Sequence, residues 1–582
     1  MESNGNGAHA AERGADVIIV GGGHNGLTAG CYLAKAGVDV LVLERSPKLG
    51  GMTSTNPIVP EAPDHVFNEG AIHATGIWRE SRIPEELELA KFGLRPLPVD
   101  PIHVQLGPDG DSIAVYADVR RTIEDIRRVS PHDARAWEEV SGMLDSMMDL
   151  VLPYMRAHPT RPLTGEMLRG LAKVASKPRY FEPLARIGVA PHTEYIDENF
   201  KHPLTRGVLA AMAAFLRMNL DATAWPLMYL GLIQRTKWSA MFVGGTGAVP
   251  DSLHKCLLHH GGRTRVNAEV EEFIMRGNRV VGVRLLGGEE VFAREAVMTT
   301  CNPKVTLTRL LPAGVLPDKL QIRADGIPTA LAKATSLKLN MALSGKLTLK
   351  RHEAWRGDGL DLRHPLIDWH TLEQHTEGWE ALTANDWPDP LPLGCVTVPT
   401  ATDPTQAPPG MDTFWAWSGL VPIFPREPWD DARDRVVQGV VDDCADYFDN
   451  LKELEIGRLA LGGPEIEERF NAPHGNVYHV DPLLFRFGPL RPAMGFGSYK
   501  SPVPGLYLSG AGTHPTGGLC GLPGKLAAQA LLRDGRSGGG SPVRGWVRGK
   551  LQARTPSTLS RQAVYSATED GVSDLPRSGT PA

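Results

Sequence analysis

Three glycines near the start of the chain have the spacing of a nucleotide-binding turn. Gly21, Gly23 and Gly26 occupy the three glycine positions of G-x-G-x-x-G. In that pattern the first glycine allows a tight turn, the second lets the backbone approach a pyrophosphate, and the third lets a helix pack closely on a strand. Glu44 stands 18 residues after Gly26, where a carboxylate accepts hydrogen bonds from an adenosine ribose. The spacing therefore predicts a dinucleotide site.

The flanking sequence supplies the elements that such a turn needs. Residues 16–20 and 38–43 are β-branched apolar runs typical of buried parallel strands, and the segment between them has helical spacing. A helix that begins near Asn25 points its free N–H groups at the phosphates, so His24 and Asn25 join the predicted contacts. The alternative is a glycine-rich turn that binds nothing, and the surrounding strand, helix and acid disfavour it.

A second pair of glycines indicates a flavin rather than a nicotinamide. "ERSPKLGGMTS" places this pair shortly after the ribose acid, and paired glycines let the backbone lie flat against a cofactor. The E-R-x-x-x-x-G-G pattern resembles the second phosphate-and-flavin contact of the glutathione-reductase-type FAD fold. That resemblance assigns cofactor contacts to Arg45, Gly50, Gly51, Met52 and Thr53.

The far end of the chain carries a matching segment. "GLYLSGAGTHPTGGLCGLPGKLAAQALL" has the pattern of a strand, a glycine loop and a helix. In the same FAD fold such a segment closes over the ribityl chain, and the helix N-terminus faces the flavin pyrimidine. The contacts expected here are Gly510, Gly512, Gly521 and Leu522. Two cofactor-binding ends so far apart in sequence imply one discontinuous FAD domain.

The predicted fold class is α/β: a glutathione-reductase-type FAD-binding Rossmann-like domain, discontinuous in sequence, with an inserted α+β substrate domain. The predicted segments are a flexible N-terminus at 1–14, the FAD domain at 15–96, 236–302 and 495–534, the substrate domain at 97–235 and 303–494, and a disordered tail at 535–582. "SLKLNMALSG" alternates strictly, which predicts a half-buried strand with Lys338 and Asn340 on its polar face.

One further glycine-rich stretch, "VGGTGAVPDSL", lacks a surrounding strand pair with a terminal acid. We expect a structural turn that leads into a helix at 248–260. A strand at 269–275 then rejoins the FAD domain and places Val270 where the backbone of this fold meets the adenine. Without a second Rossmann unit, a resident NAD(P)H reductase reaction is disfavoured.

The composition of the whole chain excludes several classes of function. The 582 residues carry a net charge of −6, which leaves no basic surplus for nucleic acid. Six scattered cysteines without metal-ligand spacing indicate a reducing compartment and no metal site. The N-terminus has no signal-peptide pattern, and we expect a cytoplasmic protein. The basic start of the tail is compatible with peripheral membrane contact, and the sequence does not indicate an oligomeric state.

Four stretches occur in order across most of residues 16–534: "VIIVGGGHNGLTAGCYLAKAGVDVLVLERSPKLGG", "FVGGTGAVPDSL", "HGNVYHVDPLLFRFGPLRP" and "GLYLSGAGTHPTGGLCGLPGKLAAQALL". Together they resemble the phytoene-dehydrogenase-like flavoproteins, the group that contains carotenoid desaturases and desaturase-type carotenoid ketolases. "DPLLFRFGPLRP" departs from the Gln-bearing form more usual in that family, and Cys520 stands where a small aliphatic residue is common. Both departures concern the substrate rather than the cofactor.

The resemblance implies an FAD-dependent oxidoreductase that moves a hydride from a substrate C–H to flavin N5 while the neighbouring carbon loses a proton. The expected substrate is a hydrophobic small molecule, either a carotenoid-like polyene or another secondary metabolite, and the expected electron acceptor is oxygen or a quinone. The alternatives are an amine-type oxidase and a flavoprotein isomerase or cyclase without net redox. The complete glycine set and Glu44 disfavour the non-enzymatic escort proteins that share the fold.

Four polar residues are candidates for catalysis. His73 follows the paired glycines at about the distance at which related flavoproteins line the ring face, and His514 lies in the C-terminal glycine loop. His479 and Asp481 form the best polar pair elsewhere, with turn capping as their alternative role. The aromatic run "TFWAWSGLVPIF" predicts a strand whose rings belong either to the core or to an apolar tunnel.

Overall fold

The computed structural model describes residues 14–537 apart from 222, 225, 332, 484 and 485. By its internal contacts the chain divides into two compact units, Met1–Leu532 and Arg533–Ala582. The final helix, α20 (Leu522–Ser537), continues three residues beyond the predicted end of the FAD domain at residue 534. The rest of the predicted tail and the predicted flexible N-terminus up to residue 13 lie outside the described residues.

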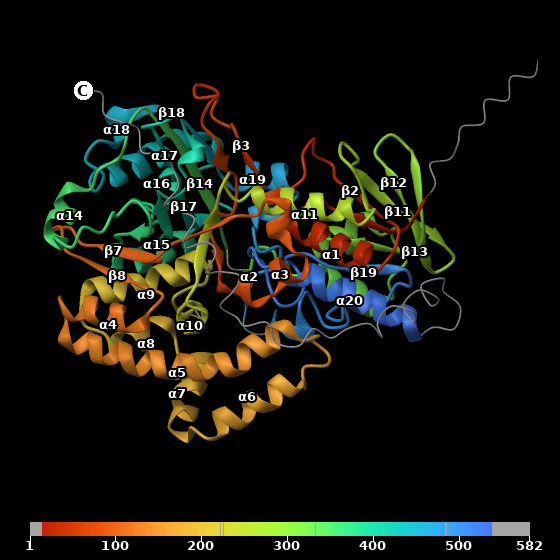
Figure 1. Ribbon diagram of the computed structural model, residues 1–582, viewed down its shortest axis with the longest axis horizontal. Coiled ribbons are helices and arrows are strands. Elements are labelled where there is room, and N and C mark those ends of the chain that lie inside the picture. Colours follow the sequence, from red (N-terminus) through yellow and green to blue (C-terminus); the bar gives the residue numbers. More distant parts are fainter. Residues whose placement is uncertain (1–13, 222, 225, 332, 484–485, 538–582) are drawn as a thin grey trace, which may run out of the picture. The chain divides into compact units, whose positions relative to one another are not determined.

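The first sheet is the predicted dinucleotide-binding sheet. Its parallel strands lie in the order β10 (Arg263–Arg265), β2 (Val40–Leu43), β1 (Ala15–Val20), β13 (Glu290–Thr299) and β19 (Leu506–Leu508). The first half of β13 pairs antiparallel with β12 (Arg279–Leu285), which pairs with β11 (Val270–Arg276). Strands far apart in sequence therefore meet at β13, which confirms the predicted discontinuous Rossmann-like fold (Figure 1).

Helix α1 (His24–Lys35) packs on this sheet and on two further helices. It begins directly after the glycine turn, one residue before the predicted start. It packs on α11 (Ala248–His259), where the Cys31 thiol donates to the Leu253 carbonyl oxygen at 3.1 Å. It also packs on α20, because a Cβ on Gly524 would lie 2.1 Å from the Asn25 carbonyl oxygen. The N-terminal and C-terminal ends of the predicted FAD domain are thus in direct contact.

The second sheet has seven strands and takes them from both segments of the predicted substrate domain. The strand order is β18 (Glu455–Leu461), β14 (Ala334–Leu343), β17 (Asp412–Pro422), β16 (Cys395–Thr397), β15 (Leu366–Asp368), β7 (His103–Leu106) and β8 (Ser112–Val115). All ten residues of β14 are buried, so the prediction of a half-buried strand is wrong. Its polar side is covered by other parts of the protein instead of facing solvent.

Helices from the first inserted segment lie below this sheet in Figure 1. They are α4 (Val119–Arg127), α5 (Pro131–Arg156), α6 (Gly165–Ala175), α7 (Phe181–Val189), α8 (His192–Asn199), α9 (Pro203–Phe215) and α10 (Leu227–Thr236). The long helix α5 starts at Pro131 behind the Ser130 N-cap, whose hydroxyl accepts the Asp133 N–H. A proline at the first helical position has no N–H to leave unpaired.

The remaining elements complete the connections. They are β3 (Thr55–Asn56), β4 (Phe67–Asn68), β5 (Ala74–Thr75), α2 (Gly76–Glu80), α3 (Ile83–Glu86), β6 (Pro96–Pro98), β9 (Ser239–Phe242), α12 (Pro303–Val305), α13 (Asp318–Asp325), α14 (Lys350–Arg356), α15 (Leu372–Thr383), α16 (Pro399–Thr402), α17 (Trp429–Ala445), α18 (Leu451–Leu454) and α19 (Gly463–Phe470). Strand β9 pairs with β5 and β6 and so joins the two predicted domains.

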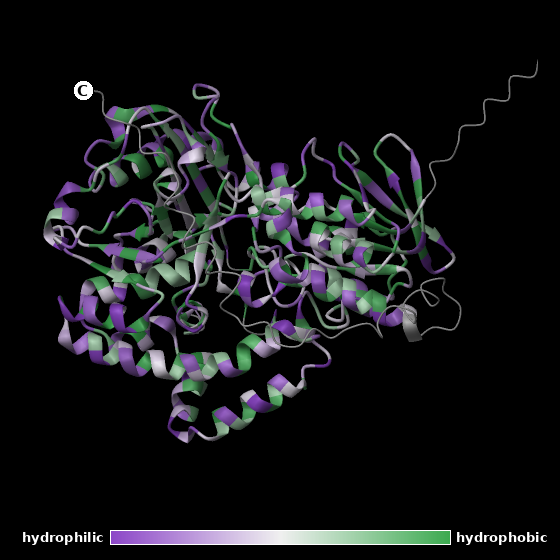
Figure 2. Cartoon of the chain, viewed as in Figure 1, coloured by the Kyte–Doolittle hydropathy of each residue, from purple (hydrophilic) through white to green (hydrophobic). Residues whose placement is uncertain are grey.

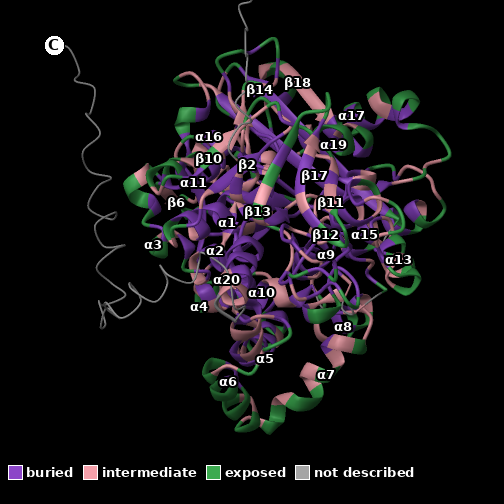
Figure 3. Cartoon of the chain, turned by 90° about the vertical axis from the view of Figure 1, so that its right-hand side faces the viewer, coloured by how far each residue is buried: buried purple, intermediate pink, exposed green. Residues whose placement is uncertain are grey.

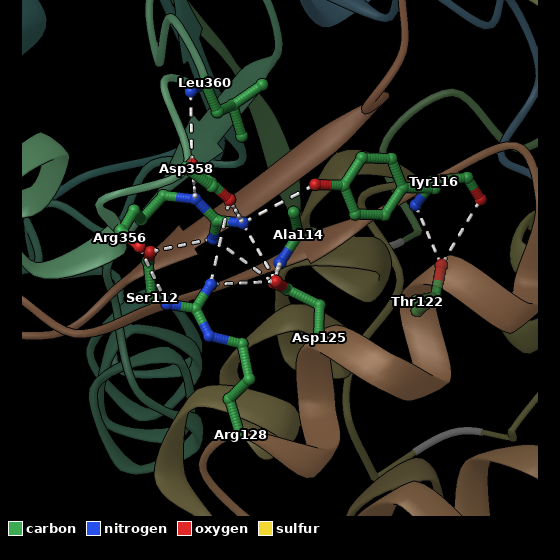
Figure 4. A network of polar contacts seen from close by, with 9 residues as sticks. All are labelled: Ser112, Ala114, Tyr116, Thr122, Asp125, Arg128, Arg356, Asp358 and Leu360. Carbon is green, nitrogen blue, oxygen red and sulfur yellow. Dashed lines mark hydrogen bonds and ion pairs between the residues drawn. The ribbon is translucent and has the colours of Figure 1, made fainter.

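A buried ionic network fixes the first inserted segment to the second (Figure 4). The Arg356 guanidinium at the end of α14 donates to Asp125 on α4 at 2.9 Å and to Asp358 at 2.8 Å. It also donates to the Ser112 hydroxyl on β8 at 3.2 Å. A buried charge needs such partners, because an isolated one would be strongly destabilising. This network is structural.

The described residues contain neither a membrane-spanning helix nor a cluster of metal ligands. No helix in that part of the chain is both long and apolar enough to cross a bilayer. No group of three or more His, Cys, Asp and Glu side chains among the same residues is arranged to hold a metal ion.

Candidate active site

A cavity of about 800 Å³ is lined by residues of both sheets. One half begins at the carboxyl ends of β1 and β2, where Val20 and Leu43 line it. The other half reaches Leu366, Trp415 and Trp417 of the second sheet. Open α/β sheets bind nucleotides in the crevice outside the carboxyl ends of their strands. The cavity therefore combines a nucleotide crevice with space beside a second, largely apolar wall.

The glycine turn has the geometry that its sequence predicts. Gly21 has a φ of +104°, and a Cβ there would lie 2.3 Å from the Thr300 hydroxyl oxygen. A Cβ on Gly26 would lie 2.1 Å from the Gly21 carbonyl oxygen, so only glycine lets α1 pack on the turn. At Gly23 the nearest atom to an added Cβ is 3.8 Å away, and this residue lines the cavity. The open position is the one expected to approach a pyrophosphate.

Glu44 is held at the cavity wall by two backbone hydrogen bonds. Its carboxylate accepts the Gly22 N–H at 2.8 Å and the Ser46 N–H at 2.9 Å. The side chain is 9% exposed and lines the cavity. A carboxylate fixed in this way is oriented in advance for a ribose.

The paired glycines lie against the first turn. The Gly50 N–H donates to the Gly22 carbonyl oxygen at 3.0 Å, and Gly50 and Gly51 have φ values of +125° and +55°. The cavity wall here includes all five residues assigned from the E-R-x-x-x-x-G-G pattern, Arg45, Gly50, Gly51, Met52 and Thr53. Val270 also lines the cavity, and the neighbouring Ala268 N–H donates to the Glu44 carbonyl oxygen at 2.8 Å. The predicted ribose and adenine contacts thus lie side by side.

The C-terminal loop differs from the prediction in detail. Gly510, Gly512, Gly521 and Leu522 are not among the described residues that line the cavity, and neither is Gly26. A Cβ on Gly510 would lie 2.5 Å from the Thr300 carbonyl oxygen, and one on Gly512 would lie 2.3 Å from Pro303 Cδ. These glycines bring the loop close to the end of β13. The loop residues that line the cavity are Ala511, Thr516, Gly517, Gly518 and Leu519.

Several buried polar atoms at the cavity wall fit a polar cofactor. His24 Nε2 and Asn25 Oδ1 are buried without a hydrogen-bond partner among the described residues, and both side chains line the cavity. Buried polar atoms in folded proteins are almost always paired, so these atoms are suited to a bound ligand. Together with Gly23 and Glu44, these side chains fit the phosphates and ribose of FAD.

Two of the four candidate catalytic residues line the cavity. His73 Nδ1 lies 3.4 Å from the Ser239 hydroxyl, and its Nε2 has no partner among the described residues. His479 also lines the cavity, and its Nδ1 has no partner in the same part of the chain. Desolvation lowers the pKa of each ring to about 4, so both imidazoles are neutral at pH 7.

The other two candidates have structural partners instead. Asp481 is fully buried, and its carboxylate accepts from Arg217 at 3.3 Å, from Asn476 at 2.7 Å and from the Leu331 N–H at 2.7 Å. His514 Nε2 lies 3.1 Å from the Tyr154 carbonyl oxygen. Neither is among the described residues that line the cavity, so we do not retain them as candidates.

Arg491 is a positioning residue whose role sequence reasoning missed. Its buried guanidinium donates to the Tyr478 and Val480 carbonyl oxygens at 2.9 and 3.1 Å. It also donates to the Ala511 and Thr513 carbonyl oxygens at 2.8 and 3.2 Å. These bonds join the segment that carries His479 to the C-terminal loop. The conspicuous Arg-Pro in "FGPLRP" was the available signal.

Lys338 on β14 is a second residue whose role at the cavity the sequence did not show; the alternation placed it only on the polar face of the strand. It is 3% exposed, lines the cavity, and its ammonium lies 5.2 Å from the centre of the Trp415 ring. Its Nζ donates to the Asn68 carbonyl oxygen. Desolvation holds the pKa of this lysine well below its usual value. The cavity therefore contains an amine that can change protonation state more easily than a surface lysine.

The second half of the cavity is aromatic. Successive side chains of β17 point to opposite faces of the sheet. Trp415 and Trp417 lie on one face and line the cavity, whereas Phe414 lies on the other face and packs in the core. The rings of this aromatic run therefore belong partly to the core and partly to the cavity wall. Phe215 stacks on Tyr229 with ring centres 5.4 Å apart and meets Trp417 edge-on at 5.5 Å. This half offers an apolar surface with rigid walls.

Comparisons with known proteins agree with this geometry. Residues 19–81 match the family model "NAD(P)-binding Rossmann-like domain". The chain is 28% identical to pyridine nucleotide-disulfide oxidoreductase domain-containing protein 2 of Rattus norvegicus over 89% of this chain and 93% of that protein. It is 25% identical to the carotenoid 3,4-desaturase of Haloarcula japonica over 90% and 99% of the two chains.

A solved structure shares the fold. Cyclohexylamine oxidase from Brevibacterium oxydans superposes with a TM-score of 0.55 at 14% identity, covering 90% of this chain and 99% of that one. At this identity the likeness concerns the fold alone. Sequence similarity over most of the chain, the match to a Rossmann-like family model and the shared fold together confirm the resemblance, the fold class and the cofactor. The chain is an FAD-dependent oxidoreductase related along most of its length to the phytoene and carotenoid desaturases.

Proposed function

We propose that the protein dehydrogenates a largely hydrophobic small molecule, such as a polyene or another apolar secondary metabolite. The single observation that carries this proposal is the continuity of one cavity from Glu44 at the nucleotide end to Trp415 and Trp417 at the aromatic end. An apolar chamber that opens onto a nucleotide crevice is suited to hold an apolar C–H bond beside the ring. When bound, FAD accepts the hydride.

The residues around the cavity have defined tasks in this proposal. The aromatic walls orient the substrate and exclude water. His73 and His479 are neutral at pH 7, and each has one ring nitrogen without a partner among the described residues, so we propose them as acceptors of the proton that the substrate loses. Lys338 supplies a hydrogen-bond donor, or a base when neutral. We propose His73, His479 and Lys338 for variants that test proton removal.

The charges of the cavity favour a neutral substrate over an ammonium ion. Among the described lining residues the carboxylates are Glu44, Glu69 and Glu269. Glu44 is at the nucleotide end, Glu269 precedes Val270 at the same end, and Glu69 is paired with Arg469. The aromatic half thus offers an incoming cation no unpaired carboxylate within the described wall. This arrangement disfavours the amine-type alternative, and a flavoprotein isomerase without net redox remains the second candidate.

Anaerobic mixing tests the proposal. A panel of polyenes, terpenoids and amines is added to the yellow holoprotein, and the flavin absorbance is followed. A dehydrogenase is reduced in stoichiometric amount by its substrate, whereas an isomerase converts substrate with the flavin band intact. Comparison of metabolites between a knockout and its parent supplies the panel. Reduction by amines alone would contradict the hydrophobic-substrate proposal.

A pair of variants on β17 tests the aromatic wall. Trp417→Leu removes a cavity-lining ring, and Phe414→Leu makes a comparable change on the opposite face of the same strand. We expect Trp417→Leu to weaken binding of the apolar substrate about tenfold or more, because it loses most of an aromatic contact. The control should bind substrate as the parent does. Equal effects of both variants would contradict the assignment of the wall.

A further inference from the structure

The cavity contains a buried cation whose hydrogen bonds are incomplete. An ammonium group has three N–H donors. In the described part of the chain the only hydrogen bond of the Lys338 ammonium goes to the Asn68 carbonyl oxygen, and the side chain is 3% exposed. Asn68 is itself fixed, because its side chain donates to Gln406 at 2.9 Å and accepts the Thr246 N–H at 2.7 Å. Two donors of Lys338 are therefore left without an acceptor among the described residues.

The acidic residue closest in role to a counter-ion is engaged elsewhere. The carboxylate of Glu69 interacts electrostatically with Lys338, but its hydrogen bonds come from Asn56 and Arg469. No ion pair joins the Lys338 ammonium to a carboxylate within the described residues. A buried cation is destabilising unless a partner compensates for its lost hydration. An acceptor oxygen on a bound molecule would supply the partner that this wall lacks.

A second donor without a partner lies beside Lys338. Trp415 lines the cavity, is 3% exposed, and its indole N–H has no hydrogen-bond partner among the described residues. The Lys338 ammonium lies 5.2 Å from the centre of this ring. A buried tryptophan N–H usually has an acceptor. Two neighbouring side chains, both of them donors, thus lack acceptors at one place in the cavity wall.

The second sheet fixes both donors. Lys338 on β14 pairs in register with Trp417 on β17, and Trp415 lies two residues away on the same face of β17. Trp417 is packed tightly, because a Cβ on Gly394 or on Gly419 would lie 2.8 Å from an atom of its ring. Both strands are buried along their whole length, as Figure 3 shows. The donors are therefore oriented before a ligand binds.

Apolar groups surround this polar place in the wall. One hydrophobic cluster contains Ile72, Leu366, Trp415 and Trp417, with Phe215 packed against it. All five residues line the cavity. Figure 2 shows the strands of this sheet as predominantly hydrophobic. A molecule bound here contacts mostly apolar side chains and meets hydrogen-bond donors at one point.

We propose that Lys338 and Trp415 form a subsite for a carbonyl or carboxylate oxygen of the substrate. The substrate is then an apolar molecule that carries such an oxygen, whereas a pure hydrocarbon lacks the group that this subsite binds. Both side chains donate and these oxygens only accept, so the groups are complementary. The inference deepens the proposed function and rests on it where the bound molecule is called a substrate. Binding of the oxygen itself can be measured without turnover.

Binding of a matched series of probes to the holoprotein tests the subsite. Farnesoic acid, its methyl ester and the hydrocarbon farnesene share one isoprenoid chain and differ in the oxygen group. Their dissociation constants are measured anaerobically by quenching of tryptophan fluorescence. We expect the acid and the ester to bind at least about tenfold more tightly than the hydrocarbon. Tighter binding of the acid than of the ester would assign a charged acceptor to the subsite, and equal affinities would assign a neutral one.

Two variants remove the donors one at a time. Lys338→Met should lower the preference for the oxygenated probes about tenfold, because it removes a charged donor and keeps a long apolar side chain. Trp415→Phe removes the N–H and keeps an aromatic ring, and it should lower the preference about two- to tenfold. The readout is a ratio of two affinities on one protein, so a general change in stability or cavity shape affects both terms alike.

Asn340→Leu is the matched control. Asn340 lies two residues from Lys338 on the same face of β14, is fully buried, and is not among the described residues that line the cavity. Leucine has the same branched shape as asparagine and no polar atom. The preference of this variant for the oxygenated probes should equal that of the parent, and all variants should keep the flavin spectrum of the parent.

Three results would overturn the subsite. One is that the parent binds farnesene within twofold of the acid and the ester. Another is that Lys338→Met keeps the preference of the parent. The third is that Asn340→Leu lowers the preference as much as Lys338→Met does. A confirmed preference in a holoprotein whose flavin no member of a metabolite panel reduces would support the subsite and contradict the proposed dehydrogenation.

Discussion

Removal of the Glu44 carboxylate should release FAD while the rest of the fold stays intact. In the structure this carboxylate accepts the Gly22 N–H at 2.8 Å and the Ser46 N–H at 2.9 Å, and its position is the one expected to meet the ribose. A hydrogen bond to a charged group is worth about 1.5–3 kcal/mol. Loss of the ribose bond in Glu44→Ala should therefore weaken FAD binding by about one to two decades.

The same substitution also affects the apoprotein. The Gly22 N–H is buried and loses its acceptor, which should cost about 1–3 kcal/mol of unfolding free energy. Ser46 is partly exposed, so water can replace the second bond. Glu44→Gln keeps one carbonyl acceptor and should fall between the parent and Glu44→Ala. Glu380→Ala, an exposed change on α15, is the control and should behave as the parent.

The measurements are the dissociation constant of FAD, from titration of apoprotein by flavin fluorescence, and the unfolding free energy in denaturant. An FAD affinity within twofold of the parent after Glu44→Ala would refute the ribose assignment. If the unfolding free energy falls while the affinity is unchanged, Glu44 serves only to brace the glycine turn.

Four further predictions follow from other parts of the structure. Arg491→Met leaves four backbone carbonyls without their donor, so the unfolding free energy should fall by about 3 kcal/mol or more; a loss under about 1 kcal/mol in denaturant titration would contradict this. Desolvation by itself lowers the pKa of the buried His370, but the Asp368 and Asp443 carboxylates, 2.8 and 3.1 Å from its ring nitrogens, outweigh it and raise the pKa to about 9. The stabilisation from this ring is therefore complete below pH 6.5 and is lost as the pH rises through about 9. The thermal midpoint of the parent should therefore fall over that window, and a similar fall in His370→Gln would exclude this cause. FAD should be released by acid precipitation, because Cys520 is buried, is not among the described cavity-lining residues, and burial raises the pKa of its thiol to about 12; yellow colour in the pellet would contradict noncovalent binding. Truncation after Ser537, the end of α20, should leave the flavin spectrum and the thermal midpoint nearly unchanged, because the glycine-rich sequence beyond it offers little apolar area to bury; a drop of many degrees would show that this segment stabilises the fold.

The sequence alone predicted residues that the structure brings together at one cavity wall, because the constraints on the glycine turn are local and sterically strict. Gly21 and Gly26 have to be glycine because a Cβ at either position would collide with atoms that pack against the same turn. Glu44 follows after one helix and one strand, whose lengths fix its distance along the chain. Short-range requirements of this kind leave a fixed spacing in the chain. The paired glycines are similar, since Gly50 has a positive φ.

The catalytic half was less predictable, because its geometry depends on packing between distant segments. Alternation in β14 correctly separated Lys338 from its apolar neighbours, but the pattern does not say what covers the polar face. In the structure other segments cover that face, so Lys338 lines the cavity and does not face solvent. Asp481 and His514 are polar residues in suggestive stretches, and the sequence pattern does not show that distant residues supply their hydrogen-bond partners.

Spacing along the chain thus indicated the cofactor, and it placed the two glycine turns that the structure brings to one cavity wall. Only the tertiary structure decided which polar groups lack a partner, where the aromatic wall lies and which residues line the C-terminal loop. The physical reason is that hydrogen-bond satisfaction and burial depend on every segment that packs against a residue. In this fold such segments are far apart along the chain. Arg491 donates to the carbonyl oxygen of Ala511 in the C-terminal loop, and Met155 and Trp417 line the same cavity.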